Sequence, residues 1–199
     1  FQVSVQGQPF GHMVAEVRPG SDSIVYLEET EIPAVGLHQT ATVVLDPRSL
    51  AVRSVYQNIR GAGQTAETRL AYAQGRVRGR AQSPDPRAGA PKTVEVDTAV
   101  AAGTIDMNAF QPLVALLPLA ENASFTVGAF DASENTVRTL TVKVSGAVDV
   151  TVPAGTFPAF RLEVNGTPQP FVFFVSRATP RRLLKIELVG QPLSFELVK

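Results

Sequence analysis

Residues 141–166 read TVKVSGAVDVTVPAGTFPAFRLEVNG, and this stretch decides the fold. Apolar and polar residues alternate on both sides of a Pro-Ala-Gly turn at 153–155, which is typical of two antiparallel strands with one buried face. Proline presets φ at the start of a turn, and glycine accepts a positive φ later in it. Asn165-Gly166 is a second hairpin signal. With a break at Ser145-Gly146, the alternation from Val137 to Lys199 predicts an antiparallel meander of about six strands.

The same pattern continues upstream of this meander. Asp46-Pro47-Arg48-Ser49 predicts a turn, because Asp is a good turn initiator and Pro suits the second position. Residues 83–91 are rich in proline and predict a flexible loop. Because strands with the same apolar–polar alternation are expected on both sides of that loop, we expect a single all-β domain over residues 1–199. The expected upstream strands are 1–8, 10–18, 24–31, 37–45, 52–60, 65–73, 76–80 and 93–100.

Residues 105–118 form the one helical insertion that the sequence predicts. Asp106 or Asn108 can cap its start, and the apolar residues that follow have helical spacing. Pro112 limits the helix and Pro118 ends it. A flat sheet of so many strands would leave an apolar face in water. We therefore expect a mainly β protein: a curved antiparallel sheet, or incomplete β-barrel, with a short apolar helix packed on its concave side.

Composition excludes several classes of function. The 18 basic and 18 acidic residues cancel, which argues against a nucleic-acid partner. The absence of cysteine excludes disulfides, thiolate zinc sites and thiol catalysis. No apolar run is long enough for a membrane-spanning helix. The chain opens directly in strand pattern, as it would if a signal peptide had been removed, so the absence of a visible leader does not argue against the periplasmic or otherwise exported location expected below.

Three motifs and the apolar helix together resemble a known bacterial family. The motifs are Val5-Gln6-Gly7-Gln8-Pro9-Phe10-Gly11 leading to Ala15-Glu16-Val17, then Val44 to Leu50, then Val148 to Phe157. The family is the domain of unknown function 3108. This resemblance implies an exported, mostly β protein with no established activity and no catalytic residues. The expected strand order is also similar to that of the periplasmic lipoprotein-carrier half-barrels, which shield a lipid-sized apolar cavity.

The run from Phe171 to Val175 is apolar on both faces, so it needs apolar cover on both. The simpler interpretation is that the helix at Phe110–Leu117 supplies this cover. The alternative is a cavity for an apolar ligand. The candidate lining residues are Phe110, Leu113, Leu117, Phe160, Phe171 and Phe173.

Arginines alternate along the strand at 76–80 and would lie on one face of it. Such a row predicts a site for an anion or a lipid headgroup. The favoured alternative is a solvated outer face balanced by Glu67, Glu95 and Asp97, because exposed ion pairs are common and weak. The arginines concerned are Arg69, Arg76, Arg78 and Arg80.

Histidines and clustered glutamates are the remaining candidates. His12 and His38 lie on different strands without a recognisable motif, so solvated strand histidines are favoured over metal ligands or general bases. Glu28, Glu29 and Glu31 fit an edge strand more simply than a paired-carboxylate glycosidase site. No phosphate-binding loop or nucleophile elbow is present. We therefore expect no metal, no cofactor and no catalytic residue.

Together these patterns predict a non-catalytic cell-envelope or periplasmic protein that binds an apolar ligand, such as a lipid or acyl chain, inside a curved β-sheet. The alternative is a structural or protein-interaction module of the envelope with a solid core and no ligand. A hydrolase is the least favoured class, because no nucleophile–base constellation is visible. The expected partner is a lipid, another apolar small molecule or an envelope protein.

Overall fold

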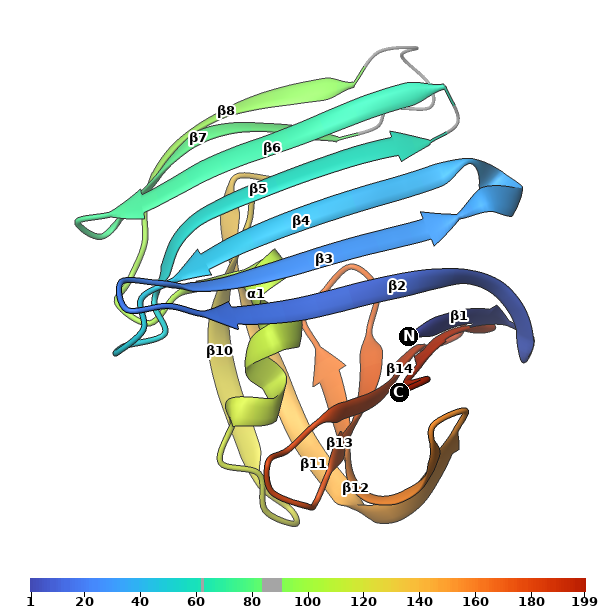
Figure 1. Ribbon diagram of the computed structural model, residues 1–199. Coiled ribbons are helices and arrows are strands. Elements are labelled where there is room, and N and C mark those ends of the chain that lie inside the picture. Colours follow the sequence, from blue (N-terminus) through green and yellow to red (C-terminus); the bar gives the residue numbers. More distant parts are fainter. Residues whose placement is uncertain (62, 84–90) are drawn as a thin grey trace. The chain divides into compact units, whose positions relative to one another are not determined.

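A computed structural model describes residues 1–61, 63–83 and 91–199 (Figure 1). The predicted flexible loop at 83–91 falls almost entirely outside these residues. The strands are β1 (Gln2–Val5), β2 (Gln8–Pro19), β3 (Ile24–Ile32), β4 (Leu37–Leu45), β5 (Val52–Gly61), β6 (Gln64–Ala73), β7 (Arg76–Ser83), β8 (Lys92–Ala99), β9 (Ile105–Asp106), β10 (Ser124–Asp131), β11 (Thr136–Val152), β12 (Gly155–Asn165), β13 (Phe171–Ser176), β14 (Leu183–Leu188) and β15 (Leu193–Glu196). The helices are α1 (Met107–Leu113) and two 3-10 turns, η1 (Pro33–Val35) and η2 (Val114–Leu116).

The strands belong to one sheet, in the hydrogen-bonded order β8-β7-β6-β5-β4-β3-β2-β1-β15-β14-β13-β12-β11-β10-β9. Strands that follow each other in the sequence pair antiparallel, as β3 does with β4 and β12 with β13. The two-residue β9 pairs parallel to β10. Within the described residues β8 and β9 are the two edges and do not pair with each other, so the sheet is open. The prediction of a mainly β protein with an antiparallel, unclosed sheet and one short helix is confirmed.

The chain divides into two compact units. Unit 1 contains Phe1–Met13, Gln111–Val127 and Thr139–Lys199, and unit 2 contains Val14–Phe110 and Gly128–Arg138. Each unit therefore combines segments that are far apart in the sequence. The expectation of one domain over residues 1–199 stays a prediction.

Unit 1 contains the predicted meander, with one strand fewer than expected. The sequence predicted a break at Ser145-Gly146, but β11 continues through it with a bulge between Val144 and Gly146. A bulge absorbs one extra residue and bends the strand without ending it. The Pro153-Ala154 turn joins β11 directly to β12, as predicted.

Asn165-Gly166 is not the tight hairpin that the sequence predicted. β12 ends at Asn165 and β13 begins only at Phe171, so a longer loop joins them. Gly166 has φ +97°, and a Cβ atom there would lie 2.2 Å from the carbonyl oxygen of Thr139. The glycine is therefore needed for close backbone approach to β11, and the turn itself is made by the residues after it.

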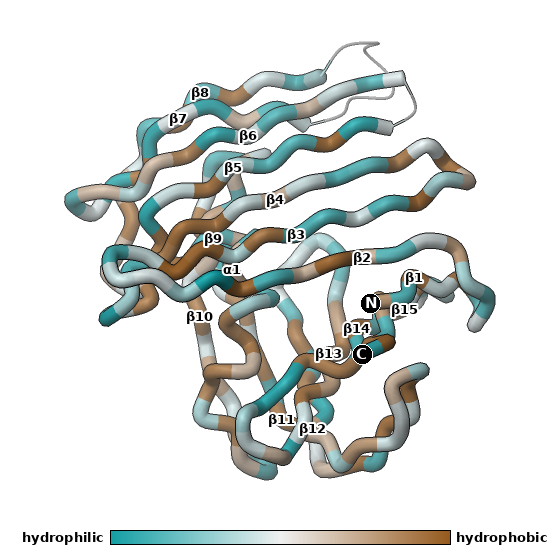
Figure 2. Tube along the Cα trace, in the orientation of Figure 1, coloured by the Kyte–Doolittle hydropathy of each residue, from teal (hydrophilic) through white to brown (hydrophobic). Residues whose placement is uncertain are grey.

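Unit 2 contains the long antiparallel strands β3 to β8, whose bounds lie within a few residues of those predicted. Apolar and polar residues are interspersed along these strands (Figure 2), and every second residue is buried from Ala41 to Leu45 in β4 and from Ala66 to Leu70 in β6. Alternate residues lie on opposite faces of a strand, so one face of each is buried. The buried face includes Tyr26, Val43, Val55 and Leu70, all 4% exposed or less. β4 and β5 keep their register up to Val44, where the ladder shifts by one residue.

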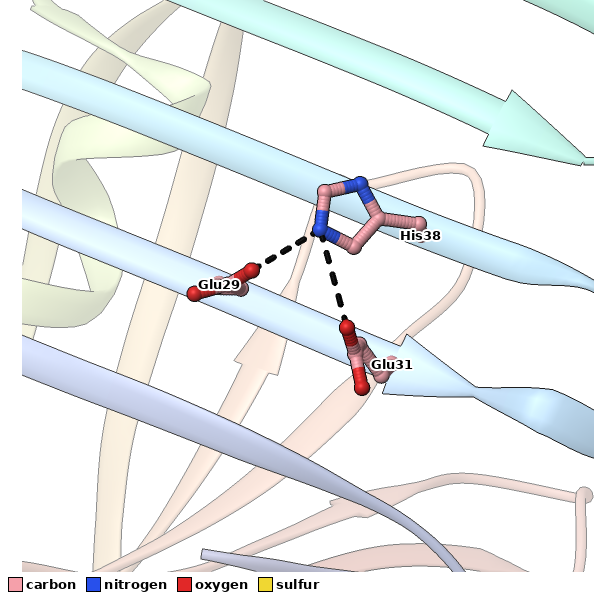
Figure 3. Close-up of side chains that lie close together, drawn as sticks. All are labelled: Glu29, Glu31 and His38. Carbon is pink, nitrogen blue, oxygen red and sulfur yellow. Dashed lines mark hydrogen bonds and ion pairs between the residues drawn. The ribbon is translucent and has the colours of Figure 1, made fainter.

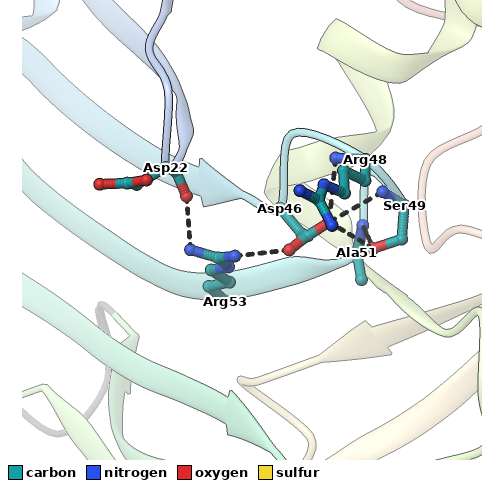
Figure 4. Close-up of polar contacts among 6 residues, drawn as sticks. All are labelled: Asp22, Asp46, Arg48, Ser49, Ala51 and Arg53. Carbon is teal, nitrogen blue, oxygen red and sulfur yellow. Dashed lines mark hydrogen bonds and ion pairs between the residues drawn. The ribbon is translucent and has the colours of Figure 1, made fainter.

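The turn predicted at Asp46 is held by side-chain hydrogen bonds (Figure 4). Asp46 Oδ1 accepts from the backbone N–H groups of Arg48 and Ser49 and from the Ser49 hydroxyl. Arg53 donates to Asp46 Oδ2 at 2.5 Å and to the carbonyl oxygen of Asp22 at 2.6 Å. The Ser49 amide, the Arg53 guanidinium and the other donors hold the pKa of Asp46 well below its usual range. This site is thus a structural turn.

The helical segment begins where the sequence predicted. Asp106 caps α1, because its Oδ1 accepts from the backbone N–H of Asn108 at 2.8 Å. Pro112 lies inside the helix, which ends one residue later and tightens into η2. Ala109, Phe110 and Val114 are buried, so the segment contributes to the core rather than to an exposed surface.

Candidate functional site

The six apolar candidates are divided between the units. Phe110 is in unit 2, whereas the other five are in unit 1. Phe160 and Phe173 are buried, while Phe171, Leu113 and Leu117 are partly exposed. The members of unit 1 are Leu113, Leu117, Phe160, Phe171 and Phe173.

Strand register places three of the predicted phenylalanines on one face of unit 1. β12 and β13 pair so that Phe160 lies opposite Val175, Leu162 opposite Phe173 and Val164 opposite Phe171. Directly opposite residues share a face, and the rings of Phe171 and Phe173 lie 5.9 Å apart. We call this surface the Phe173 face; its residues are Phe160, Leu162, Val164, Phe171, Phe173 and Val175.

The opposite face of β13 is also apolar. Val172 and Phe174 belong to a buried cluster, against which the half-buried Phe157 packs. From Val172 to Ser176 both faces of this strand are thus buried, whereas Phe171 stays partly exposed. The cluster consists of Val150, Val152, Ala159, Val172, Phe174, Leu184 and Leu197.

Two arginines cover the ring of Phe160. The guanidinium carbons of Arg177 and Arg181 lie 5.4 Å and 5.5 Å from the ring centroid, within the range of cation–π attraction. Arg181 also donates to the carbonyl oxygens of Leu117 and Leu119, at 2.7 Å and 3.1 Å. Arg181 therefore ties the chain after η2 to the sheet of unit 1.

The predicted arginine row exists, and each arginine lies near a carboxylate. Arg69 and Arg80 are cross-strand neighbours. Arg69 pairs with Glu67 at 2.8 Å, and Arg80 lies 3.7 Å from Glu95. Asp97 is shared by the other two, Arg76 at 2.8 Å and Arg78 at 3.2 Å. This is the balanced outer face that the favoured interpretation described, and an anion or headgroup site here stays a prediction.

The two histidines have different surroundings. His12 is exposed on β2, opposite Gln2 of β1. His38, on β4, lies beside two glutamates of β3 (Figure 3). Its Nε2 is 2.8 Å from Glu29 Oε1 and 3.8 Å from Glu31 Oε1. Of the three predicted glutamates, Glu29 and Glu31 therefore share the exposed face with His38.

Glu28 lies on the other face of β3, in a partly buried polar group. The hydroxyl of Tyr26 donates to Glu28 Oε2 at 2.7 Å, and Gln39 lies 3.5 Å from Oε1. Burial raises the pKa of Glu28, and burial together with the neighbouring carboxylate raises that of Tyr26. The hydrogen bond accounts for this carboxyl without a ligand.

Asp106 in unit 2 is more deeply buried than Glu28 and is 1% exposed. Tyr72 donates to its Oδ2 at 2.5 Å, and Asn108 donates to its Oδ1 through both backbone and side-chain nitrogens. Gln57 extends this series of hydrogen bonds by donating to Asn108 Oδ1 at 3.1 Å. Burial raises the pKa of Asp106. The sequence identified Asp106 as a helix cap but did not indicate its tyrosine partner.

A shallow pocket of about 450 Å³ lies in unit 1 beside a charged cluster. Lys185, one of its lining residues, lies 2.9 Å from Glu187 and 3.1 Å from Glu196. Burial opposes the charged form of Lys185, but hydrogen bonds to both carboxylates leave its pKa raised. None of the six apolar candidates lines this pocket.

Comparison with known proteins gives one match. The sequence profile of a protein family of unknown function, DUF3108, matches residues 1–198, essentially the whole chain. The chain belongs to the DUF3108 family. The resemblance seen in its turns and strands is thus confirmed. No curated protein and no solved structure matches the chain.

For this DUF3108 chain, the similarity to lipoprotein-carrier half-barrels stays a prediction, as do the exported location and the apolar ligand. None of the described helices has the length and hydropathy needed to cross a bilayer. Glu29, Glu31 and His38 lie close together. The sequence analysis considered these residues separately and did not predict that they form a group. The register of β3 and β4 brings it together, and a register cannot be read from two isolated strand patterns.

Proposed function

We propose that this protein is a non-catalytic binding protein of the cell envelope that holds an apolar chain, such as the acyl chain of a lipid, on the Phe173 face of unit 1. The observation that carries the proposal is the second apolar surface of β13. Val172 and Phe174 belong to a buried cluster on the opposite side of the strand. The Phe173 face adds three aromatic rings that this cluster does not use.

Phe171 is where a ligand would make contact. It is partly exposed, whereas Phe173 beside it is 4% exposed. Leu113 and Leu117 of the same unit are also partly exposed. Contact with an acyl chain would remove the remaining apolar surface of these residues from water, which is favourable by about 25 cal/mol per Å².

The titratable groups of unit 2 support a non-catalytic role. Glu28 and Asp106 both have raised pKa values, which often mark catalytic acids. Each, however, accepts a hydrogen bond from a tyrosine hydroxyl of its own unit. Such partners account for buried carboxyls as structural groups.

The test is native mass spectrometry of the purified protein, followed by organic extraction and lipid analysis. We expect a co-purifying apolar species in near-stoichiometric amount. Phe171→Ala should reduce this loading. Phe157→Ala is the matched control, because Phe157 is a half-buried phenylalanine of the same unit that packs against the opposite cluster.

A clean apo mass, unchanged on addition of fatty acids or phospholipids, would overturn the proposal. The second candidate, an envelope interaction module with a solid core, would then be preferred. The tight burial of Val175, Leu162 and Val164, each 1% exposed or less, favours that candidate. Fractionation of cells that express the full-length native protein would test the envelope location separately.

A further inference from the structure

The strand pair β3–β4 brings two carboxylates and an imidazole together on one exposed surface (Figure 3). Glu31 lies directly opposite His38 in the register, and Glu29 lies opposite Thr40, one step along the same face. The pairing runs from Ile24 to Ile32 without a bulge, so the backbone fixes which residues lie next to one another on this face. One oxygen of each glutamate and a ring nitrogen of His38 all lie within 4.8 Å of one another.

The two glutamates converge on the same nitrogen of His38. Nε2 of a neutral imidazole can donate only one proton, and Glu29 Oε1 lies at hydrogen-bond distance from it, 2.8 Å. Glu31 Oε1 approaches the same nitrogen from a second direction, at 3.8 Å. Two like charges on one strand face repel each other. A cation placed among the three atoms would relieve that repulsion and use all three.

The ligand set matches a transition metal better than calcium or magnesium. Imidazole nitrogen and carboxylate oxygen together suit zinc and its neighbours, whereas calcium and magnesium take oxygen ligands only. Zinc bonds of about 2.0–2.1 Å in a tetrahedron place ligand atoms about 3.3 Å apart. The observed separations of 2.8 Å and 3.8 Å bracket this value. Small rotations of two exposed glutamate side chains would complete the geometry.

We propose that Glu29, Glu31 and His38 form a binding site for a divalent transition-metal ion, with zinc the best-matched ion. Three protein ligands leave a coordination position for water or for a group from a bound molecule, as in open zinc sites. Glu29 also lines a shallow pocket of about 270 Å³ with Leu27, Thr40 and Thr42. The site is independent of the apolar-ligand function, because its three residues belong to unit 2.

One neighbouring charge opposes the ion. Arg60 of β5 lies directly opposite His38, and its positive charge reduces the attraction for a cation. We therefore expect Arg60→Gln to tighten zinc binding. Screening by salt at this exposed position makes that gain smaller than the loss caused by removing a ligand.

The first experiment is calorimetric titration of the purified, chelator-treated protein with zinc chloride, with magnesium and calcium chlorides as comparisons. We expect one zinc ion per chain and no comparable binding of magnesium or calcium. His38→Ala, and separately Glu29→Gln, should each weaken zinc binding by more than about tenfold. His12→Ala is the matched control, because it removes the other of the chain's two histidines and should leave zinc binding unchanged.

Nuclear magnetic resonance of the imidazole rings gives an independent readout, since the chain has only two. Zinc should shift the His38 ring signals at substoichiometric amounts and leave those of His12 in place. Circular dichroism of each variant checks that the fold persists. Zinc binding that survives in His38→Ala, or equal shifts of both rings, would show an adventitious ion only and overturn the proposal.

Discussion

β13 in unit 1 and β3 in unit 2 differ in which of their faces are buried and in the residues that those faces carry. From Val172 to Ser176 every residue of β13 is buried, and its apolar side chains fill both faces. β3 has one buried face, and that face carries Tyr26, Glu28 and Thr30. Its other face presents Glu29 and Glu31 to solvent. The side chains of β13 are thus packed mainly by apolar contact, whereas the inner face of β3 also carries a hydrogen bond between Tyr26 and Glu28.

Because of this difference, the stability of the two regions should respond to different changes. Apolar packing loses stability when side-chain volume is removed, and it does not respond to pH. A buried polar group loses stability when a hydrogen-bond partner is removed, and a carboxyl within it makes stability depend on pH. Unit 1 should therefore respond to truncation of its core, and unit 2 to loss of single hydroxyls and to pH.

The largest effect is expected for Leu162→Ala in unit 1. Leu162 is 0% exposed and lies opposite Phe173 on the Phe173 face. Loss of its methyl groups leaves a cavity, which should lower the free energy of unfolding by about 2–5 kcal/mol. Urea denaturation measures this loss, with the exposed Val148→Ala as control. A loss no larger than that of the control would show that the Phe173 face is loosely packed.

A smaller effect is expected for Tyr72→Phe in unit 2, and it should depend on pH. The variant removes the hydroxyl that donates to buried Asp106, at an expected cost of about 1–3 kcal/mol. Burial raises the folded-state pKa of Asp106, so its contribution to stability is present at low pH and falls as pH rises through that value. The Tyr72 hydrogen bond favours the charged form, and its loss raises this pKa further.

The stability difference between the wild-type protein and Tyr72→Phe should therefore grow as pH increases. Urea denaturation at several pH values between about 4 and 8 tests the sign. Tyr56→Phe is the control, because its hydroxyl contacts an exposed glutamate, Glu67. A difference that shrinks with rising pH would mean that Tyr72 stabilises the neutral form of Asp106.

The smallest effect is expected for Arg80→Ala, on the solvated face of unit 2. Arg80 lies 3.7 Å from Glu95, both side chains are more than half exposed, and exposed pairs contribute little. We expect no measurable change in the unfolding midpoint at low or high salt. A marked loss of phosphate or anionic-vesicle binding in this variant would instead support the headgroup site that the arginine row suggested.

Much of the fold was predictable because strand alternation is a local signal. The bounds of β4 agree with those expected, and Asp106 caps α1 as its position suggested. One error concerns Glu28, Glu29 and Glu31, because their strand β3 lies between β2 and β4 and is not the edge strand that the sequence suggested. Two further errors concern glycines. Ser145-Gly146 resembled a break and is a bulge, while Gly166 serves close approach to Thr139 rather than a tight turn. In both cases a neighbouring strand, absent from the local pattern, decides what the glycine does.

The sequence indicated which residues could form a site, but not which of them lie together in the folded chain. The alternation of Arg76, Arg78 and Arg80 correctly placed them on one face, because that follows from the two-residue period of a strand. The convergence of His38 with Glu29 and Glu31 depends on which residue of β4 lies opposite which residue of β3. A slip of one residue would have turned the histidine to the other face.

The fold class, the positions of most strands and turns, and the family could be read from the amino-acid sequence, since these depend on periodicity and turn chemistry within short segments. The pairing and register of the strands became visible in the folded chain. They also determine that Phe173 lies opposite Leu162, that Tyr72 meets Asp106 and that two glutamates meet one histidine. Such contacts join residues distant in sequence, and the pairing of whole strands determines them rather than the preference of any single residue.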